Sequence, residues 1–232
     1  MKTMSDSFTK HSTGTHTRLY AHDSNMSFLF IPIYAALYIP CFIFLEKHSY
    51  ADSTVVHMAT DDRIPFCEVF IIPYLMWFLY MIGVIVASYF TDRDDYVRGF
   101  FYMASGMTIF ILVSFLFPNY HDLRPEVMPR SNILSSMVSI LQRTDTPSNL
   151  FPSLHVHNSI AAHITVMHNR VFRKKKWICN LSLVLCISII FSTLLIKQHS
   201  LFDIITAITM SAVLYPFFFD SADKTKATDR LS

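Results

Sequence analysis

Long apolar segments restrict the fold of this chain more than any other feature. A helix that crosses the hydrocarbon core of a bilayer, about 30 Å thick, needs roughly 20 predominantly apolar residues. Five segments have about that length and almost no charge, at residues 28–45, 69–90, 100–117, 178–196 and 201–219. Only 16% of the residues are charged, whereas soluble domains carry about 25%. The sequence therefore predicts an integral membrane protein.

A sixth segment, residues 151–168, has a suitable length but contains several Ser, Asn and His residues. We count it as a span because the segments on both sides of it need the chain to cross there. The predicted fold is all-α, with six transmembrane helices in one bundle and one membrane domain at residues 28–219. Polar tails at 1–27 and 220–232 flank this domain.

The distribution of basic residues predicts the orientation, because cytoplasmic loops are enriched in Lys and Arg. Placing both termini in the cytoplasm puts thirteen of the nineteen Lys and Arg residues on that side, including the run 173–176. The first apolar segment is followed by Glu46 and Lys47, which is unlike a cleaved signal peptide. We expect a bacterial plasma membrane. The net charge of +2 and the lack of a binding motif give no reason to expect a nucleic-acid partner.

Three polar clusters fall on the predicted outer side. His199 and Asp203 are four residues apart at the start of the last span, where the carboxylate can hold the imidazole in one tautomer. Pro152 and Ser153 precede His155 at the start of the fourth span, and the amino terminus of a helix favours anions. Arg124 in the preceding loop provides a bidentate phosphate ligand. Together these residues indicate chemistry on a phosphate.

The order of these motifs resembles the type 2 phosphatidic acid phosphatase superfamily. The matching positions are Arg124-Pro125, the segment Pro152-Ser153-Leu154-His155, and Ser192 through His199 to Asp203. The resemblance implies that His199 is the nucleophile and forms a phosphohistidine, that Asp203 orients it, and that His155 protonates the leaving alcohol. It also implies that Arg124 and Ser153 bind the phosphoryl oxygens.

The chain departs from the family pattern at three positions. Phe117 and Thr193 stand where the family has a lysine and an arginine, and we expect Lys197 to supply a replacement charge. Leu154 stands where glycine is usual, which resembles the branch that contains inositol phosphorylceramide synthases. Members of that branch transfer a head group between lipids instead of releasing phosphate.

Other polar residues are candidates for the wall of an internal cavity. On a helical wheel His155, Ser159 and His163 share a face, whereas His157 and His168 point the other way. We expect His157 and His168 to form hydrogen bonds between helices, which is also the simpler explanation for His163. The candidate cavity residues are Tyr120, His121, Ser159, His163 and Ser192.

The leading functional hypothesis is a metal-independent lipid phosphatase that cleaves a phosphomonoester or phosphodiester. No cluster of metal ligands or cofactor motif is present in the sequence. The expected substrate is a membrane lipid, either a phospholipid or an isoprenoid phosphate. The alternatives are a head-group phosphotransferase, a non-enzymatic carrier, and a degenerate family member. The sequence does not select the lipid, the reaction or the oligomeric state.

Overall fold

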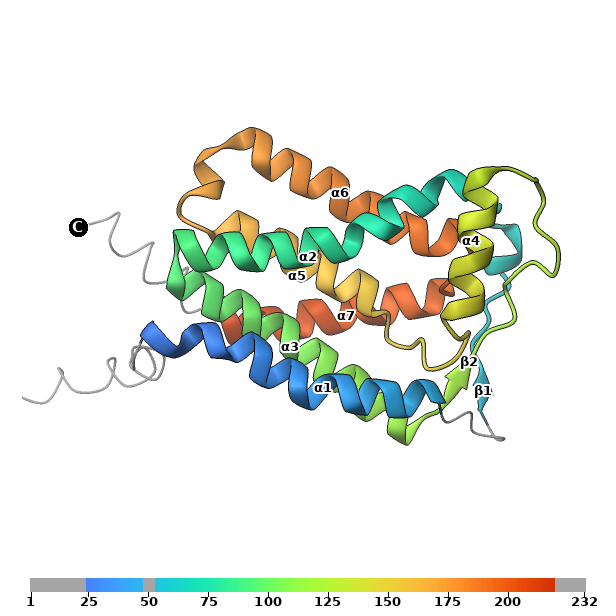
Figure 1. Ribbon diagram of the computed structural model, residues 1–232, viewed down its shortest axis with the longest axis horizontal. Coiled ribbons are helices and arrows are strands. Elements are labelled where there is room, and N and C mark those ends of the chain that lie inside the picture. Colours follow the sequence, from blue (N-terminus) through green and yellow to red (C-terminus); the bar gives the residue numbers. More distant parts are fainter. Residues whose placement is uncertain (1–23, 48–52, 220–232) are drawn as a thin grey trace, which may run out of the picture.

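The computed structural model describes residues 24–47 and 53–219, and within these ranges the protein is a helical bundle (Figure 1). The tails predicted at 1–27 and 220–232 therefore lie outside the described residues, except for 24–27, which belong to a short 3-10 helix (Ser24–Leu29). The described α-helices are α1 (Phe30–Lys47), α2 (Ile71–Thr91), α3 (Arg93–Leu116), α4 (Ile133–Thr144), α5 (Leu154–His168), α6 (Lys176–Leu195) and α7 (Leu201–Phe218). Two short strands, β1 (Thr54–Val55) and β2 (Asn119–Tyr120), pair in parallel with Thr54 opposite Asn119.

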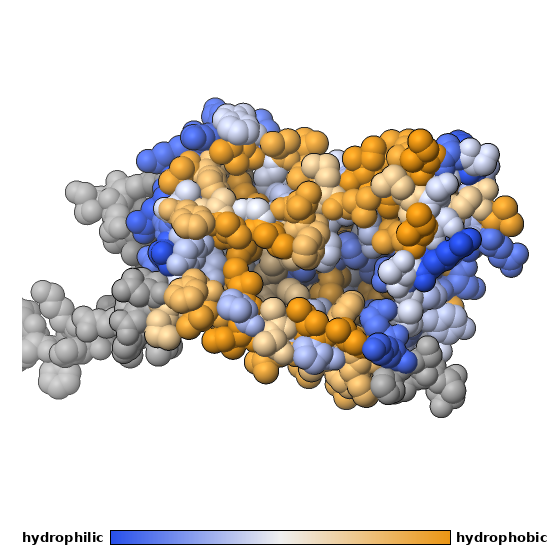
Figure 2. All heavy atoms as spheres, viewed as in Figure 1, coloured by the Kyte–Doolittle hydropathy of each residue, from blue (hydrophilic) through white to orange (hydrophobic). Residues whose placement is uncertain are grey.

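Five helical segments are long and apolar enough to cross a membrane, which confirms the five apolar segments as candidate spans. They are Met26–Lys47, Glu68–Thr91, Arg93–Leu116, Lys176–Leu195 and Leu201–Phe218. Their outer faces are apolar, as Leu37 and Leu79 show with 68% and 72% exposure. Figure 2 shows hydrophobic side chains across the middle of one face and hydrophilic ones at its two ends. This pattern fits a protein surrounded by lipid.

The fourth predicted span is α5, and it lies in the centre of the bundle. It packs against α2, α3, α6 and α7, so other helices surround its Ser, Asn and His side chains. With fifteen residues it is about 22 Å long, because an α-helix rises about 1.5 Å per residue. It is therefore shorter than the five candidate spans, and the count of six remains a prediction.

Local capping explains where α3 begins. The sequence predicts this span from residue 100, but the helix starts at Arg93, immediately after its N-cap Asp92. The Asp92 carboxylate accepts hydrogen bonds from the amides of Asp94 and Asp95 at 3.1 and 3.2 Å. Such a cap satisfies amides that have no partner within the helix.

Helix α4 was not predicted as an element. It lies in the loop between α3 and α5 and begins after Asn132, whose side chain caps the amide of Ser135 at 2.8 Å. Its buried residue Val138 packs in a cluster with Ile71, Tyr74 and Ile196. Helix α4 thus covers the end of the bundle at which α6 turns into α7 (Figure 1).

Candidate functional site

Two histidines from different helices meet at the α4 end of the bundle. His199, in the turn between α6 and α7, places its Nε2 3.3 Å from Nδ1 of His155 in the first turn of α5. The other ring nitrogen of His199, Nδ1, lies 3.2 Å from Oδ2 of Asp203. A carboxylate in this position accepts the Nδ1 proton and leaves the lone pair on Nε2. The predicted His199–Asp203 pair is therefore formed, and Nε2 faces the second histidine.

The start of α7 fixes Asp203 in place. Ser200 is the N-cap of this helix, and its amide donates to Oδ2 of Asp203 at 3.0 Å, while the Ser200 hydroxyl accepts from the helix in return. This capping box uses a serine at the N-cap and an acidic residue three positions later. The same carboxylate oxygen thus caps the start of α7 and orients His199.

Two aromatic rings of α2 hold His155. The ring centroids of Tyr74 and Trp77 lie 4.6 and 4.3 Å from that of His155. Neither aromatic residue was singled out from the sequence, because both lie within an apolar span and resemble ordinary lipid-facing or core residues. Their packing sets the direction in which the imidazole points.

Burial keeps His199 neutral. Only 5% of the residue is exposed, and burial, together with the nearby Arg124 guanidinium, lowers its pKa from the usual 6.5 to about 3. Burial also lowers the pKa of His121 to about 4, and its Nε2 lies 2.9 Å from the carbonyl oxygen of Gln198. A neutral imidazole is the form that can act as a nucleophile.

Arg124 lies beside this turn but is bound to protein acceptors. Its guanidinium donates to the carbonyl oxygens of Gln142 and Asp145, both at 2.7 Å, and to Oε1 of Gln198 at 2.6 Å. Its Nε is buried and has no partner among the described residues. Gln198, the residue that precedes His199 in the chain, therefore connects Arg124 to the α6–α7 turn, a link that the sequence did not indicate.

The other two expected phosphate ligands are engaged elsewhere. The Ser153 hydroxyl caps α5 by accepting from the amide of Val156 at 3.4 Å. The Lys197 ammonium donates to the carbonyl oxygen of Asp61 at 2.7 Å, so it does not reach back towards His199. The Asp61 carboxylate in turn accepts from the Ser200 hydroxyl at 2.6 Å. Sequence reasoning missed Asp61, which joins the segment after β1 to the α6–α7 turn.

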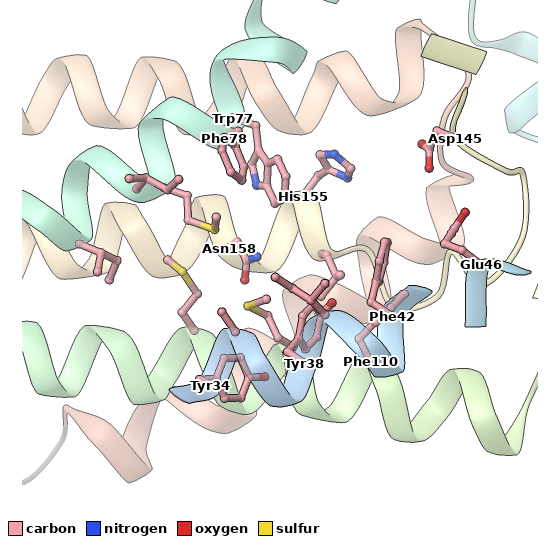
Figure 3. A pocket seen from close by; sticks show the side chains of 18 of the residues that line it. Tyr34, Tyr38, Phe42, Glu46, Trp77, Phe78, Phe110, Asp145, His155 and Asn158 are labelled. Carbon is pink, nitrogen blue, oxygen red and sulfur yellow. The ribbon is translucent and has the colours of Figure 1, made fainter. Parts of the chain in front are cut away.

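The two histidines line one end of a cavity of about 700 Å³, a size that accommodates a small organic ligand or part of a lipid. Figure 3 shows its wall from close by, with His155, Glu46 and Asp145 towards one end. The remaining wall is mainly apolar and comes from α1, α2, α3 and α5; it includes Ile31, Tyr34, Tyr38, Phe42, Leu75, Trp77, Phe78, Ile82, Phe100, Met103, Met107, Phe110 and Asn158.

The expected cavity residues do not line this space. Tyr120, His121, Ser159, His163 and Ser192 are all absent from its wall. The helical wheel grouped His155 with the residues that follow it at i+4 and i+8, but this side of α5 turns towards α6. There His163 contacts the Ser182 hydroxyl at 3.0 Å. The cavity instead lies along His155 and Asn158, at a spacing of i and i+3.

The remaining histidines of α5 make the expected contacts between helices. The His157 ring is completely buried and lies 2.8 Å from the Ser211 hydroxyl of α7 and 3.2 Å from the Tyr102 carbonyl of α3. His168 lies 3.2 Å from the Tyr215 hydroxyl. Among the residues that the structure describes, no three His, Cys, Asp or Glu side chains are grouped closely enough to hold a metal ion.

The fold and the site define a helical membrane protein with paired histidines at the end of an apolar cavity. The family model of the PAP2 superfamily matches residues 95–226, which is more than half of the chain, and the protein therefore belongs to this superfamily. The match runs from the first turn of α3 beyond the end of α7 and contains His155, His199 and Asp203. PAP2 members are generally phosphatases, so membership suggests phosphatase or phosphotransferase activity in a membrane protein. No curated protein and no solved structure gave a significant match.

Proposed function

We propose that this protein cleaves a lipid phosphomonoester or phosphodiester at the outer face of the membrane, through a phosphohistidine on His199. The observation that carries the proposal is the chain of contacts from Asp203 through His199 to His155, at 3.2 and 3.3 Å, at the end of a mainly apolar cavity that accommodates part of a lipid. The carboxylate supplies orientation, the buried imidazole supplies the nucleophile, and the second imidazole supplies an acid and base.

In the first half of the reaction, Nε2 of His199 attacks the phosphorus atom and the bond to the leaving oxygen breaks. His155, in its protonated form, gives a proton to that oxygen and becomes neutral, and the lipid alcohol leaves. In the second half, His155 removes a proton from water, the water oxygen attacks the phosphohistidine, and the phosphorus–nitrogen bond breaks. Both histidines are then restored. Asp203 holds the Nδ1 proton throughout and stabilises the positive charge that forms on the ring.

The reaction requires the two rings to separate. In the free protein they are in hydrogen-bond contact, which leaves no room for a phosphoryl group between them. Substrate binding must therefore insert the phosphoryl group between Nε2 of His199 and His155. The Tyr74 and Trp77 rings form the wall along which His155 would move.

We propose that Arg124 supplies the main positive charge that neutralises the phosphate, since its guanidinium already contributes to the lowered pKa of His199. Ser153 and Lys197 reach a phosphoryl group only if their present hydrogen bonds, to the α5 backbone and to the Asp61 carbonyl, break. Positioning and charge neutralisation account for most of the catalysis of phosphoryl transfer. Arg124 is therefore the cation on which this chain depends.

Head-group transfer is the alternative that the cavity supports. The cavity wall beside His155 is mainly apolar. A lipid alcohol can therefore lie there as the acceptor of the phosphoryl group in place of water. The same phosphohistidine serves both reactions, and only the acceptor differs. Transfer is the activity of the branch that the Leu154 motif resembles.

The test uses purified protein in mixed micelles with a panel of lipids, and measures both released phosphate and new lipid products. We expect His199→Ala to lower turnover by at least about a thousandfold, because it removes the nucleophile, and Asp203→Asn to leave a residual rate. His57→Ala is the matched control, since this histidine pairs with Asp62 and Asp122, neither of which lines the cavity. We also expect a chelator to leave the rate unchanged.

Mass spectrometry of trapped wild-type protein should place a phosphate on His199. A folded His199→Ala protein that kept more than a few per cent of the rate would disprove the covalent mechanism. New phospholipid products without phosphate release would identify the transferase. A wild-type protein without any turnover would indicate a degenerate member or a carrier.

A further inference from the structure

One polar side chain lies within the apolar part of the cavity wall. Asn158, on α5, has no exposed area, and neither its Nδ2 nor its Oδ1 has a hydrogen-bond partner in the described part of the chain. Figure 3 shows it in the wall between Trp77 on one side and Tyr34 and Tyr38 on the other. A buried amide without partners is unfavourable, so its presence calls for an explanation.

Two other buried asparagines, Asn119 and Asn169, satisfy both amide atoms within the fold, and buried Asn149 still donates its Nδ2 to the Leu45 carbonyl at 3.2 Å, although its Oδ1 has no partner among the described residues. Asn119 donates to the Phe117 carbonyl at 2.9 Å and accepts from the amide of Leu150 at 2.9 Å. Asn169 donates to the Thr91 hydroxyl at 2.9 Å and accepts from the amide of Val171 at 3.0 Å. These asparagines hold loops and helix ends. Asn158 lies in the second turn of α5, and neither of its amide atoms has a partner among the described residues, which indicates that its partner comes from outside the chain.

The position of Asn158 fixes how far this partner lies from the reacting phosphate. His155 and Asn158 are three residues apart on one face of α5, and both line the cavity. The helix rises about 4.5 Å over three residues. A phosphorus atom held between His155 and His199 therefore places the second or third carbon of the attached alcohol beside Asn158.

The chemistry of an amide restricts the partner further. Asn158 offers a donor and an acceptor at the same point, which matches a ligand hydroxyl or secondary amide, because each of these also donates and accepts. An ester or an ether only accepts, and a polyprenyl chain does neither. Two further polar atoms of the cavity wall, the Tyr38 hydroxyl and the Trp77 Nε1, also have no partner among the described residues.

We propose that Asn158 selects lipid phosphates that carry a hydroxyl or a secondary amide two or three carbons from the phosphate ester oxygen, and that it discriminates against polyprenyl phosphates. This inference rests on the proposed function for its geometry, since it takes the phosphate to lie between the two histidines. It adds to that function a specificity residue and a substrate class.

The first experiment compares four single-chain substrates with the same sixteen-carbon backbone: hexadecyl phosphate and its 2-hydroxy, 2-acetamido and 2-methoxy derivatives. We expect the wild-type kcat/KM for the hydroxy and acetamido compounds to exceed that for the plain compound by about tenfold, the scale of one or two well-placed hydrogen bonds. The methoxy compound should fall near the plain one. Farnesyl phosphate should also be a poor substrate.

The second part repeats the series with Asn158→Leu and with a control, Thr165→Val. Asn158→Leu should remove the preference, so that kcat/KM for the hydroxy and acetamido compounds falls by about tenfold, to the value for hexadecyl phosphate. Thr165 is buried on the same helix, its hydroxyl donates to the Ala161 carbonyl of that helix, and it does not line the cavity, so its variant should keep the preference. Phosphate release at equal rates from all four compounds by the wild type would overturn the inference and leave the proposed function standing.

A binding measurement separates the two proposals if no phosphate is released. The chain has two tryptophans, so Trp177→Phe leaves Trp77 in the cavity wall as a single fluorophore. In a His199→Ala background, brominated analogues of hexadecyl phosphate and its 2-hydroxy derivative should quench Trp77 with apparent Kd values that differ by about tenfold. Equal quenching would overturn the inference. A difference that Asn158→Leu abolishes would support it even if the proposed reaction were wrong.

Discussion

At the scale of single residues, the site depends on a short spacing and on two contacts that cross the bundle. The separation of four residues between His199 and Asp203 suffices to bring their side chains to 3.2 Å, because the capping box of α7 fixes the carboxylate. The contact between His199 and His155 joins residues 44 positions apart. The position of Lys197 depends on Asp61, which is still more distant in the sequence.

Burial of His199 makes folding sensitive to acid. Its pKa is about 3 in the folded protein and about 6.5 in an unfolded chain. Between these values the unfolded chain binds a proton that the folded protein does not. The free energy of unfolding should therefore fall as the pH drops below about 6.5, by at most about 1.4 kcal/mol per pH unit for one proton. Unfolding measured in detergent from pH 8 to pH 4 tests this.

The control for this measurement is His199→Gln, which removes the titrating ring. It should reduce the slope of the free energy of unfolding against pH by up to about 1.4 kcal/mol per pH unit, the contribution of one proton. His121, with a pKa of about 4, contributes in the same direction and should account for part of the remaining slope. Asp145 acts in the opposite direction, because burial and Glu46 raise its pKa to about 6. An unchanged slope in His199→Gln would show that this ring is not buried in its neutral form.

At the scale of elements, α5 can be polar because other helices surround it. Its close approach to α3 depends on small residues: a Cβ added at Gly106 would overlap the His157 ring, and one at Gly99 would overlap Thr165. Small residues at helix crossings allow this kind of contact in membranes. The resulting packing holds the first turn of α5, and with it His155, against α2.

We expect Gly106→Ala to destabilise the protein by about 1–3 kcal/mol, because the methyl group forces the buried His157 ring to move. Gly83→Ala in α2 is the matched control. A Cβ there meets no atom within 4 Å, so the change should be neutral or slightly stabilising through helix propensity. The measurement is the melting temperature of both variants, determined by thermal unfolding in the same detergent. Equal melting temperatures would contradict the tight crossing of α3 and α5.

At the scale of the whole molecule, the two ends of the bundle differ in role. The candidate site and α4 lie at one end, and the basic connection between α5 and α6 lies at the other (Figure 1). The positive-inside rule assigns this basic end to the cytoplasm. The orientation, and with it the side on which the site lies, remains a prediction.

Cysteine labelling of intact cells tests the orientation. Val127 is 81% exposed at the α4 end, and Lys175 is exposed at the opposite end. In a background without the four native cysteines, Val127→Cys should react with a membrane-impermeant thiol reagent and Lys175→Cys should react only after the cells are opened. The reverse pattern would move the candidate site to the cytoplasmic face.

The sequence by itself determined the features that arise from neighbouring residues. Apolar length defined five candidate spans, because lipid demands hydrocarbon side chains over a fixed thickness. Residues four apart on a helix meet, so the pairing of His199 with Asp203 could be predicted from their spacing. The motif order also identified the superfamily that the match to residues 95–226 shows.

Only the tertiary structure decided which face of α5 borders the cavity. Periodicity groups His155 with Ser159 and His163 as readily as with Asn158, and the choice depends on where α2 and α6 pack. The structure turned Ser159 and His163 away, brought Trp77 and Tyr74 onto His155, and bound Lys197 to Asp61. These contacts join residues far apart in the chain, so no local pattern contains them. The physical reason is that helix packing, not helix formation, determines which side chains share a cavity.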